Sequence, residues 1–533
     1  MGAFKLAKRF LSQEICRRLD ITYFDRRCPK RGWVSELNRH RVFVHASMVF
    51  FAIVPSLAGY TIYLTDIPNA VARITINLKL ISDPSSSAFY AFKPVLIPNM
   101  ALDVWGLLFG RLIGVENAML IFIMLVIVLL YAVVQQLRLL IIGRTSLLVG
   151  AISLFLIQSG TFRWGLMNYE MGMAIMLATV ALTERHVAEP SGVSSPGNIA
   201  ARSALCLLSV MCSVFPVALY GCYVAGRLPS VLEGQDWNEN AKKIVALGVP
   251  FLPVLAFLAV AHLSPAGGHE TDWTIYGKVS GIVALFYVRA PGLELPIAIA
   301  FAAALVLLFA ICRFRVAPSQ RLGLIFMAVL YVTLPSRLVS VDAVEYRLAQ
   351  PIALLLIAST ELSRRNGKVW AGPARLVGAT FVLLAFVRPL VSMASLQPVD
   401  QLRYSISHLF ETVPSGSRVL VVTDLPEFRY FGHRIWHLPL LSAAEHRGDI
   451  FMGSVFSNFF TQRKHPFDEF TSGTVQLGVD AFPDLCRWTH VLLIGNASGL
   501  PPSLPLIDER RDGAAAILDV DRTACTMLDK SDG

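Results

Sequence analysis

The chain has 533 residues, of which 55% are hydrophobic and only 16% are charged. Soluble globular domains carry about 25% charged residues, so this composition excludes an ordinary soluble protein. The net charge is +10. Much of the basic excess precedes residue 42, where it is typical of a cytoplasmic flank beside a first membrane span and not of nucleic-acid binding.

Apolar runs begin at residue 42 and recur as far as residue 396. Most of them approach the length that crosses a bilayer as a helix, roughly 17–25 residues. Residues 200–226 are harder to assign, because Pro216 interrupts them, and we interpret them as two short helices that meet near Phe215. The sequence therefore predicts a polytopic α-helical membrane protein with about eleven transmembrane helices. The predicted spans are residues 42–64, 117–141, 146–159, 164–183, the two halves of 200–226, 244–262, 294–312, 322–338, 347–362 and 376–396.

An odd number of spans places the two ends of the chain on opposite sides of the membrane. We predict a basic cytoplasmic segment at 1–41, a transmembrane domain at 42–396 with a first extracytoplasmic loop at 65–116, and an extracytoplasmic domain at 397–533. The runs RVLVVT and HVLLIG in the last domain are typical of buried parallel strands, which predicts a small α/β domain. Cys486 and Cys525 both lie there, and they would be able to pair in an oxidising compartment.

The first extracytoplasmic loop holds the most concentrated set of candidate functional residues. Asp66 opens it where the first span ends, and Arg73, Lys93 and Asp103 follow. Asp before Pro68 also fits a simple helix cap, which is the structural alternative for Asp66. Ionisable groups at membrane depth cost about 2.5–3.5 kcal/mol each, so they tend to face polar cavities or each other. Further candidates lie at the predicted external ends of other membrane helices, namely Arg163, Glu170 and Arg347. We expect Arg163 to pair with Glu170.

Other polar residues favour structural interpretations. The cysteines show no metal-binding spacing. Three residues of the second external segment, at positions 269, 270 and 272, have side chains that can bind a divalent ion, although such residues on a loop are more often simply solvated. His433 and His437 are expected to be ordinary surface or core histidines of the terminal domain, and Asp342 and Glu345 to cap a helix. The group in the second external segment is His269, Glu270 and Asp272.

A cavity with both signs of charge suits glycosyl transfer from a lipid phosphate. The phosphate is already a good leaving group and needs cations, not a proton donor. One carboxylate then suffices as the general base for the acceptor hydroxyl. Arg73, Lys93 and Arg347 are the candidate cations, and Asp66 is the candidate base.

The layout resembles the GT-C superfamily of integral membrane glycosyltransferases, in which a first external loop opens with an acidic residue. The segments DIPNAVAR, FYAFKPVLIPNMALD and RWGLMNYEMG also resemble those of uncharacterised bacterial membrane proteins of similar layout. The resemblance implies an inverting hexosyl- or pentosyltransferase of the bacterial inner membrane, with Asp66 as the catalytic residue. It implies a polyprenyl-phosphate-linked donor and a lipid, glycan or protein acceptor. A second acidic residue does not follow Asp66, so use of a divalent metal stays open.

Two alternatives use the same charged cavity. A transporter or flippase for lipid-linked glycans would bind its substrate there without chemistry, although no internal repeat supports this reading. An O-antigen polymerase or ligase is also polytopic, but its large functional loop usually lies late among the spans. Here the first loop is the one rich in polar residues.

Overall fold

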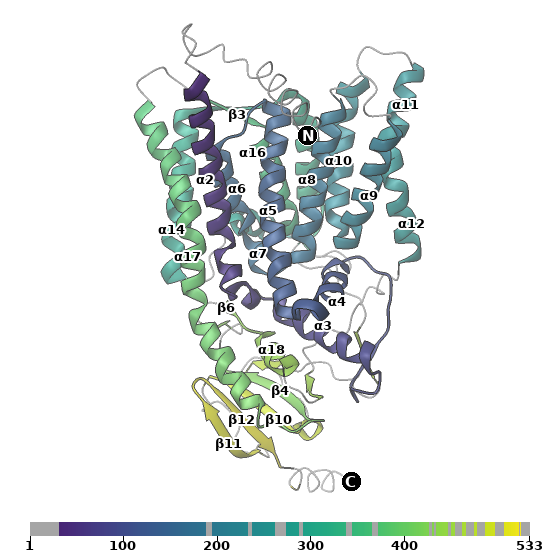
Figure 1. The fold of residues 1–533 in the computed structure, drawn as a ribbon, viewed down its shortest axis with the longest axis vertical. Coiled ribbons are helices and arrows are strands. Elements are labelled where there is room, and N and C mark those ends of the chain that lie inside the picture. Colours follow the sequence, from purple (N-terminus) through teal and green to yellow (C-terminus); the bar gives the residue numbers. More distant parts are fainter. Residues whose placement is uncertain are drawn as a thin grey trace.

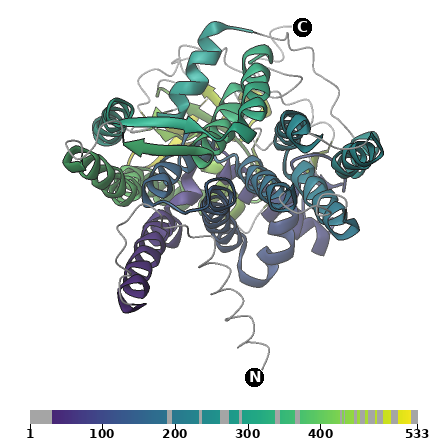
Figure 2. The same cartoon turned by 90° about the horizontal axis from the view of Figure 1, so that it is seen from above.

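The computed structural model consists of a bundle of helices joined to a smaller domain with a β-sheet (Figure 1). Most helices run roughly parallel to one long axis, and the sheet lies beyond one end of the bundle. Viewed along that axis, the helices stand side by side (Figure 2). The structure describes residues 31–187, 195–232, 237–261, 273–286, 291–336, 344–364, 371–425, 429–430, 433–445, 449–452, 461–464, 474–476, 485–495, 506–521 and 523.

The centre of the bundle is α5, which has buried residues along its whole length and packs against α8, α4, α2 and α6. One stripe of α5 stays uncovered, where Ile121, Val128 and Leu139 are 41%, 38% and 44% exposed, and other helices pack against the rest of its surface. The helices of the first half are α2 (Arg31–Leu57), η1 (Tyr60–Tyr63), α3 (Ile67–Ser82), α4 (Ala101–Ile113), α5 (Val115–Ile142), α6 (Leu147–Ile157), α7 (Gly160–Arg163) and α8 (Met167–Val187).

The second half of the bundle packs around α8 and α17. The short η3 turn follows α13 directly. These helices are α9 (Pro196–Cys212), α10 (Val214–Leu232), α11 (Trp237–Gly248), η2 (Val249–Phe251), α12 (Leu252–Val260), α13 (Ile275–Val283), η3 (Ala284–Phe286), α14 (Pro291–Ile311), η4 (Pro318–Gln320), α15 (Arg321–Thr333), α16 (Val344–Ala358) and α17 (Ala371–Phe410).

The chain is a multi-pass membrane protein. Among the described residues, four helices are long and apolar enough to cross a bilayer, and several shorter apolar helices accompany them. The predicted number of about eleven spans is not settled by these lengths and stays a prediction. The four long helices cover Val115–Ile142, Trp237–Val260, Gly292–Ile311 and Pro373–Phe410.

The interrupted segment at 200–226 forms two helices, α9 and α10, as the sequence predicted. The break falls at Ser213 and not at Pro216, because a proline in the first turn of a helix lacks only an N–H that would have no partner there. We had interpreted both helices as short. They extend beyond the predicted limits to 17 and 19 residues, about 26–29 Å at ~1.5 Å per residue.

The last membrane helix continues without a break into the terminal domain. We expected the span to end at residue 396, but α17 runs on to Phe410 and carries the sheet at its end (Figure 1). The predicted strands are confirmed as β4 (Arg418–Thr423) and β10 (His490–Ile494), which pair in parallel. The sheet order is β11-β12-β10-β4-β7, with β9 also paired to β4. Its other members are β7 (Phe451–Met452), β9 (Thr474–Gln476), β11 (Leu506–Asp512) and β12 (Ala515–Val520). Helix α18 (Leu438–Glu445) packs against α3 and α17.

Three small strand pairs connect distant parts of the chain, and none was predicted. In the first, β1 (Tyr90–Phe92) pairs with β8 (Thr461–Arg463), which attaches the first loop to the terminal domain. In the second, β2 (Cys312–Val316) pairs with β3 (Thr360–Arg364) across the end of the bundle opposite the terminal domain (Figure 2). The third is the two-residue pair of β5 (Arg429–Tyr430) and β6 (His433–Arg434).

Candidate functional site

Asp66 lies at the N-terminus of α3, and its carboxylate does not cap that helix. The helix begins at Ile67 with Pro68 in its first turn, where a fixed backbone angle favours helix formation. Asp66 occupies the cap position, yet its side chain accepts no capping hydrogen bond. The side chain is 38% exposed. The simple capping alternative is therefore not what the structure shows.

The backbone of Asp66 is held by the turn that follows α7. Its N–H donates to the carbonyl of Trp164 at 3.0 Å. Gly165 adopts φ 77°, a conformation that side chains with a Cβ rarely adopt. A Cβ at this glycine would lie 3.0 Å from the nitrogen of Asp66. The glycine thus allows two backbone segments to meet at the candidate base.

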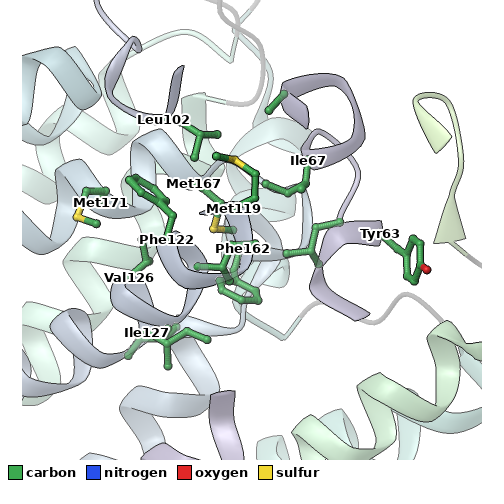
Figure 3. Packing of buried hydrophobic residues seen from close by; sticks show 14 of the residues in the cluster. Tyr63, Ile67, Leu102, Met119, Phe122, Val126, Ile127, Phe162, Met167 and Met171 are labelled. Carbon is green, nitrogen blue, oxygen red and sulfur yellow. The ribbon is translucent and has the colours of Figure 1, made fainter. Parts of the chain in front are cut away.

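A buried apolar cluster packs next to this junction. Ile67, Leu102 and Met167 come from α3, α4 and α8, and all three lie in one region of the core (Figure 3). The N–H of Leu102 also donates to Asn168 at 2.7 Å. The starts of three helices are therefore fixed relative to one another within a close-packed interior.

The terminal domain contributes a histidine to the same place. His437 immediately precedes α18, and its Nε2 lies 4.0 Å from Oδ1 of Asp66. Burial lowers the pKa of His437 to about 4, and the positive charge of Arg73 lowers it further. The imidazole is therefore neutral at neutral pH. We had expected an ordinary surface or core histidine, and His437 is indeed buried, but it also lies beside the candidate base.

An aromatic and basic group surrounds this contact. The guanidinium of Arg434 lies 4.7 Å from the ring centre of Trp164 and 5.3 Å from that of Trp436. The rings of Trp164 and Tyr346 meet edge to face at 6.4 Å. The basic and aromatic sequence HRIWH was the available signal for this group, but it did not indicate where the terminal domain docks.

Arg73 and Asp103, two candidates from the first loop that we had not paired from the sequence, are brought together. Nε and Nη2 of Arg73 donate to the two carboxylate oxygens of Asp103 at 2.7 and 2.9 Å. Both side chains are almost fully buried. The fork geometry gives a strong pair that joins α3 to α4.

Arg163 and Glu170 do not pair with each other, so this expectation was wrong. Arg163 forms an ion pair with Glu294 at 3.1 Å. Glu170 contacts the hydroxyl of Thr161 at 2.6 Å and the amide of Gln350 at 3.2 Å. We had placed Arg163 and Glu170 on one helix, whereas α7 ends at Arg163 and α8 begins at Met167.

The remaining candidate cations lie in different surroundings. The guanidinium of Arg347 is 6.0 Å from the ring centre of Tyr169 and 5.8 Å from that of Phe215, a cation–π arrangement. The hydroxyl of Tyr169 donates to the carbonyl of Arg347. Lys93 is exposed just after β1.

No metal centre is seen among the residues that the structure describes, where no three His, Cys, Asp or Glu side chains gather. Glu345 is buried near the start of α16. The predicted candidates His269, Glu270, Asp272 and Asp342 lie outside the described residues.

Comparison with known proteins gives matches to solved structures alone. No family model matches the chain, and no curated protein matches its sequence. Among solved structures, the chain is similar to ArnT from Cupriavidus metallidurans bound to undecaprenyl phosphate, with a TM-score of 0.49 and 13% identity over 88% of this chain and 97% of ArnT. The apo state of ArnT gives the same TM-score and identity over 89% and 98%.

Proposed function

We propose that the chain transfers a sugar from a polyprenyl-phosphate donor to a lipid, glycan or protein acceptor at the outer face of the bacterial inner membrane. The observation that carries this proposal is the placement of Asp66. Its carboxylate is partly exposed, does not cap its own helix and lies in a junction built by α3, the turn after α7 and the terminal domain.

In this reaction Asp66 accepts the proton of the acceptor hydroxyl. The acceptor oxygen then attacks the anomeric carbon as the bond from that carbon to the phosphate oxygen breaks. The polyprenyl phosphate leaves with the bonding electrons, and displacement in one step inverts the anomeric centre. One base is sufficient, because the leaving group needs charge stabilisation and not protonation.

The surroundings of Asp66 support its role as a base. His437 is neutral at neutral pH, so it does not neutralise the carboxylate as a charged imidazolium would. Arg434 and Arg347 are the proposed phosphate-side cations. Arg434 lies over the ring of Trp164, and Arg347 directly follows Tyr346, whose ring meets that of Trp164. Arg73 uses two of its donors on Asp103, which favours a role in holding α3 in place.

A disulfide-bonded cysteine in the terminal domain supports the proposed location of that domain outside the cytoplasm. Cys486 is disulfide-bonded, whereas Cys206, Cys212, Cys222 and Cys312 in the membrane domain are free. Disulfides persist in oxidising compartments such as the bacterial periplasm. The proposed partner of Cys486, Cys525, lies outside the described residues.

The test uses the full chain purified in lipid nanodiscs and a panel of labelled undecaprenyl-phosphate hexoses and pentoses, with extracted envelope lipids and glycans as acceptors. Asp66→Asn should lower donor consumption by about 10²–10⁴-fold, the usual contribution of a general base. Asp83→Asn is the matched control, because Asp83 is exposed at the other end of the same helix.

An Asp66→Asn variant that consumes donor as fast as the wild type would refute the assignment of the base. Failure of the wild type to consume any donor in the panel would refute the transferase proposal. Parallel assays with EDTA and with added Mg²⁺ or Mn²⁺ decide whether a divalent metal takes part.

A further inference from the structure

A second binding place lies away from Asp66, between α3 and α18. A cavity of about 100 Å³ separates these two helices where the first loop meets the terminal domain. Ala72 lines it from α3, and Ala443 and Ala444 line it from α18. Three small side chains at facing positions leave this space open, although the helices otherwise pack closely.

One end of the cavity carries a carboxylate in a fixed position. Asp449 accepts hydrogen bonds from the hydroxyl of Ser87 at 2.7 Å and from the backbone N–H of Ala88 at 2.6 Å. Its own N–H donates to Ser415 at 3.0 Å. A carboxylate held by two hydrogen bonds, on a residue whose backbone is also fixed, is preorganised and needs little rearrangement to accept a further hydrogen bond.

Pairing of the first loop with the terminal domain keeps these walls together. Strand β1 pairs with β8 directly after the Ser87 segment. Lys464 follows β8, and its ammonium donates to the carbonyl of Ser87 at 2.6 Å. The walls of the cavity therefore come from the membrane domain and the terminal domain, and hydrogen bonds hold the two together.

The charge at the rim is balanced. Lys79 lines the same cavity as Asp449. Burial lowers the pKa of Lys79, and the negative charge of Asp449 acts in the opposite direction. A site with one ammonium and one carboxylate gives no net attraction to a phosphate or to a cation. It favours a neutral ligand whose groups both donate and accept hydrogen bonds.

The floor of the cavity is apolar. Ile76 and Leu440 lie there together with the three alanines. Small-molecule sites commonly combine an apolar lining with a few fixed polar groups that set orientation. A sugar ring matches this lining, because its C–H face is apolar and its edge carries hydroxyls for Asp449 and Lys79.

We propose that this cavity binds one sugar ring of a glycan acceptor. The inferred role of the ligand as an acceptor rests on the proposed transferase function, whereas sugar binding itself does not. Ala72 follows Asp66 by six residues on α3, about 9 Å along the helix axis. A glycan held by one ring in the cavity would therefore extend along α3 towards the candidate base.

The experiment measures binding of methyl glycosides of common hexoses, pentoses and N-acetylhexosamines to the full chain in nanodiscs by saturation-transfer NMR, without any donor. We expect at least one glycoside to bind the wild type. Ala443→Leu should reduce its affinity at least tenfold by filling the cavity, and Lys79→Met should weaken it through loss of a donor. Ser85→Leu is the matched control, since that side chain is exposed in the same loop and does not line the cavity. It should bind as the wild type does.

Several outcomes would overturn the proposal. They are the absence of binding by every glycoside, equal affinity in Ala443→Leu and wild type, and competition by inorganic phosphate or by a short peptide at the same place. Thermal unfolding of each variant identifies any loss of binding that follows from misfolding, and Lys79→Met then decides the result. Asp66→Asn should retain full sugar binding, so failure of the transferase proposal is seen separately from failure of this one.

Discussion

Replacing Arg73 by Met should destabilise the chain by about 3–5 kcal/mol, the cost of leaving one member of a buried ion pair without its partner. Two hydrogen bonds of 2.7 and 2.9 Å join Arg73 to Asp103, and their side chains are only 6% and 0% exposed. The Asp103 carboxylate would stay in the protein interior without the guanidinium that compensates its charge. The double variant Arg73→Met/Asp103→Leu should recover most of that loss, because it leaves no buried charge behind.

The assay compares urea unfolding of the full chain in one detergent, followed by tryptophan fluorescence, for the wild type, both single variants and the double variant. Arg511→Met is the control for an exposed pair, because Arg511 and Glu509 are 41% and 43% exposed at 2.9 Å. Its effect should stay under about 1 kcal/mol. If the double variant were as unstable as Arg73→Met alone, the two charges would not be coupled, and the structural role of Arg73 would be wrong.

Two further predictions concern the junction at Asp66. Lowering the pH from 6.5 to 4 should remove about 3 kcal/mol of stability through His437. The pKa of His437 falls from 6.5 in the unfolded chain to about 4 in the folded chain, so only the unfolded chain binds the proton in this pH window. Above pH 6.5 neither state binds it, and this part of the stability is fully present. His437→Asn should flatten this part of a melting-temperature scan, and an unchanged slope would assign it to other groups. Gly165→Ala should lower transfer activity far more than Gly143→Ala. Both positions force the alanine into a left-handed backbone that costs about 1–2 kcal/mol, but only the Cβ at residue 165 would meet the backbone of Asp66. Equal activities would show that the contact is unimportant.

The sequence predicts those parts of the molecule that follow from local patterns. Long apolar runs place α5 and α17, because side chains that face lipid or other helices are both apolar. β-branched runs place β4 and β10, because these strands are buried on both faces. The end of α17 was misplaced, because helix propensity persists beyond the membrane while hydropathy does not. Strands β1 and β8 are three residues each and pair across the chain, so neither has a periodicity to read.

The candidate site was predicted in part for the same reason. Asp66 is visible in sequence because it interrupts an apolar run, and Arg73 and Asp103 share its loop. Arg163 and Glu170 were assigned to each other because sequence spacing assumes a continuous helix, which the left-handed Gly165 interrupts. Burial then pairs Arg163 with Glu294 on α14, a contact that no local spacing encodes.

The terminal domain forms part of the candidate site, because it packs against the membrane bundle beside Asp66. His437 reaches Asp66 only because α18 packs against α3, and α18 is positioned by the long extension of α17. Arg403 on that extension holds Glu116 at the start of α5 and also Glu445 at the end of α18. One guanidinium therefore joins the membrane bundle, the helix that enters the terminal domain and the helix that begins next to His437. A chain truncated after α17 would keep Asp66 but lose the imidazole, Arg434 and one wall of the cavity between α3 and α18 together, so the proposed catalysis and the proposed acceptor binding would depend on the same docking.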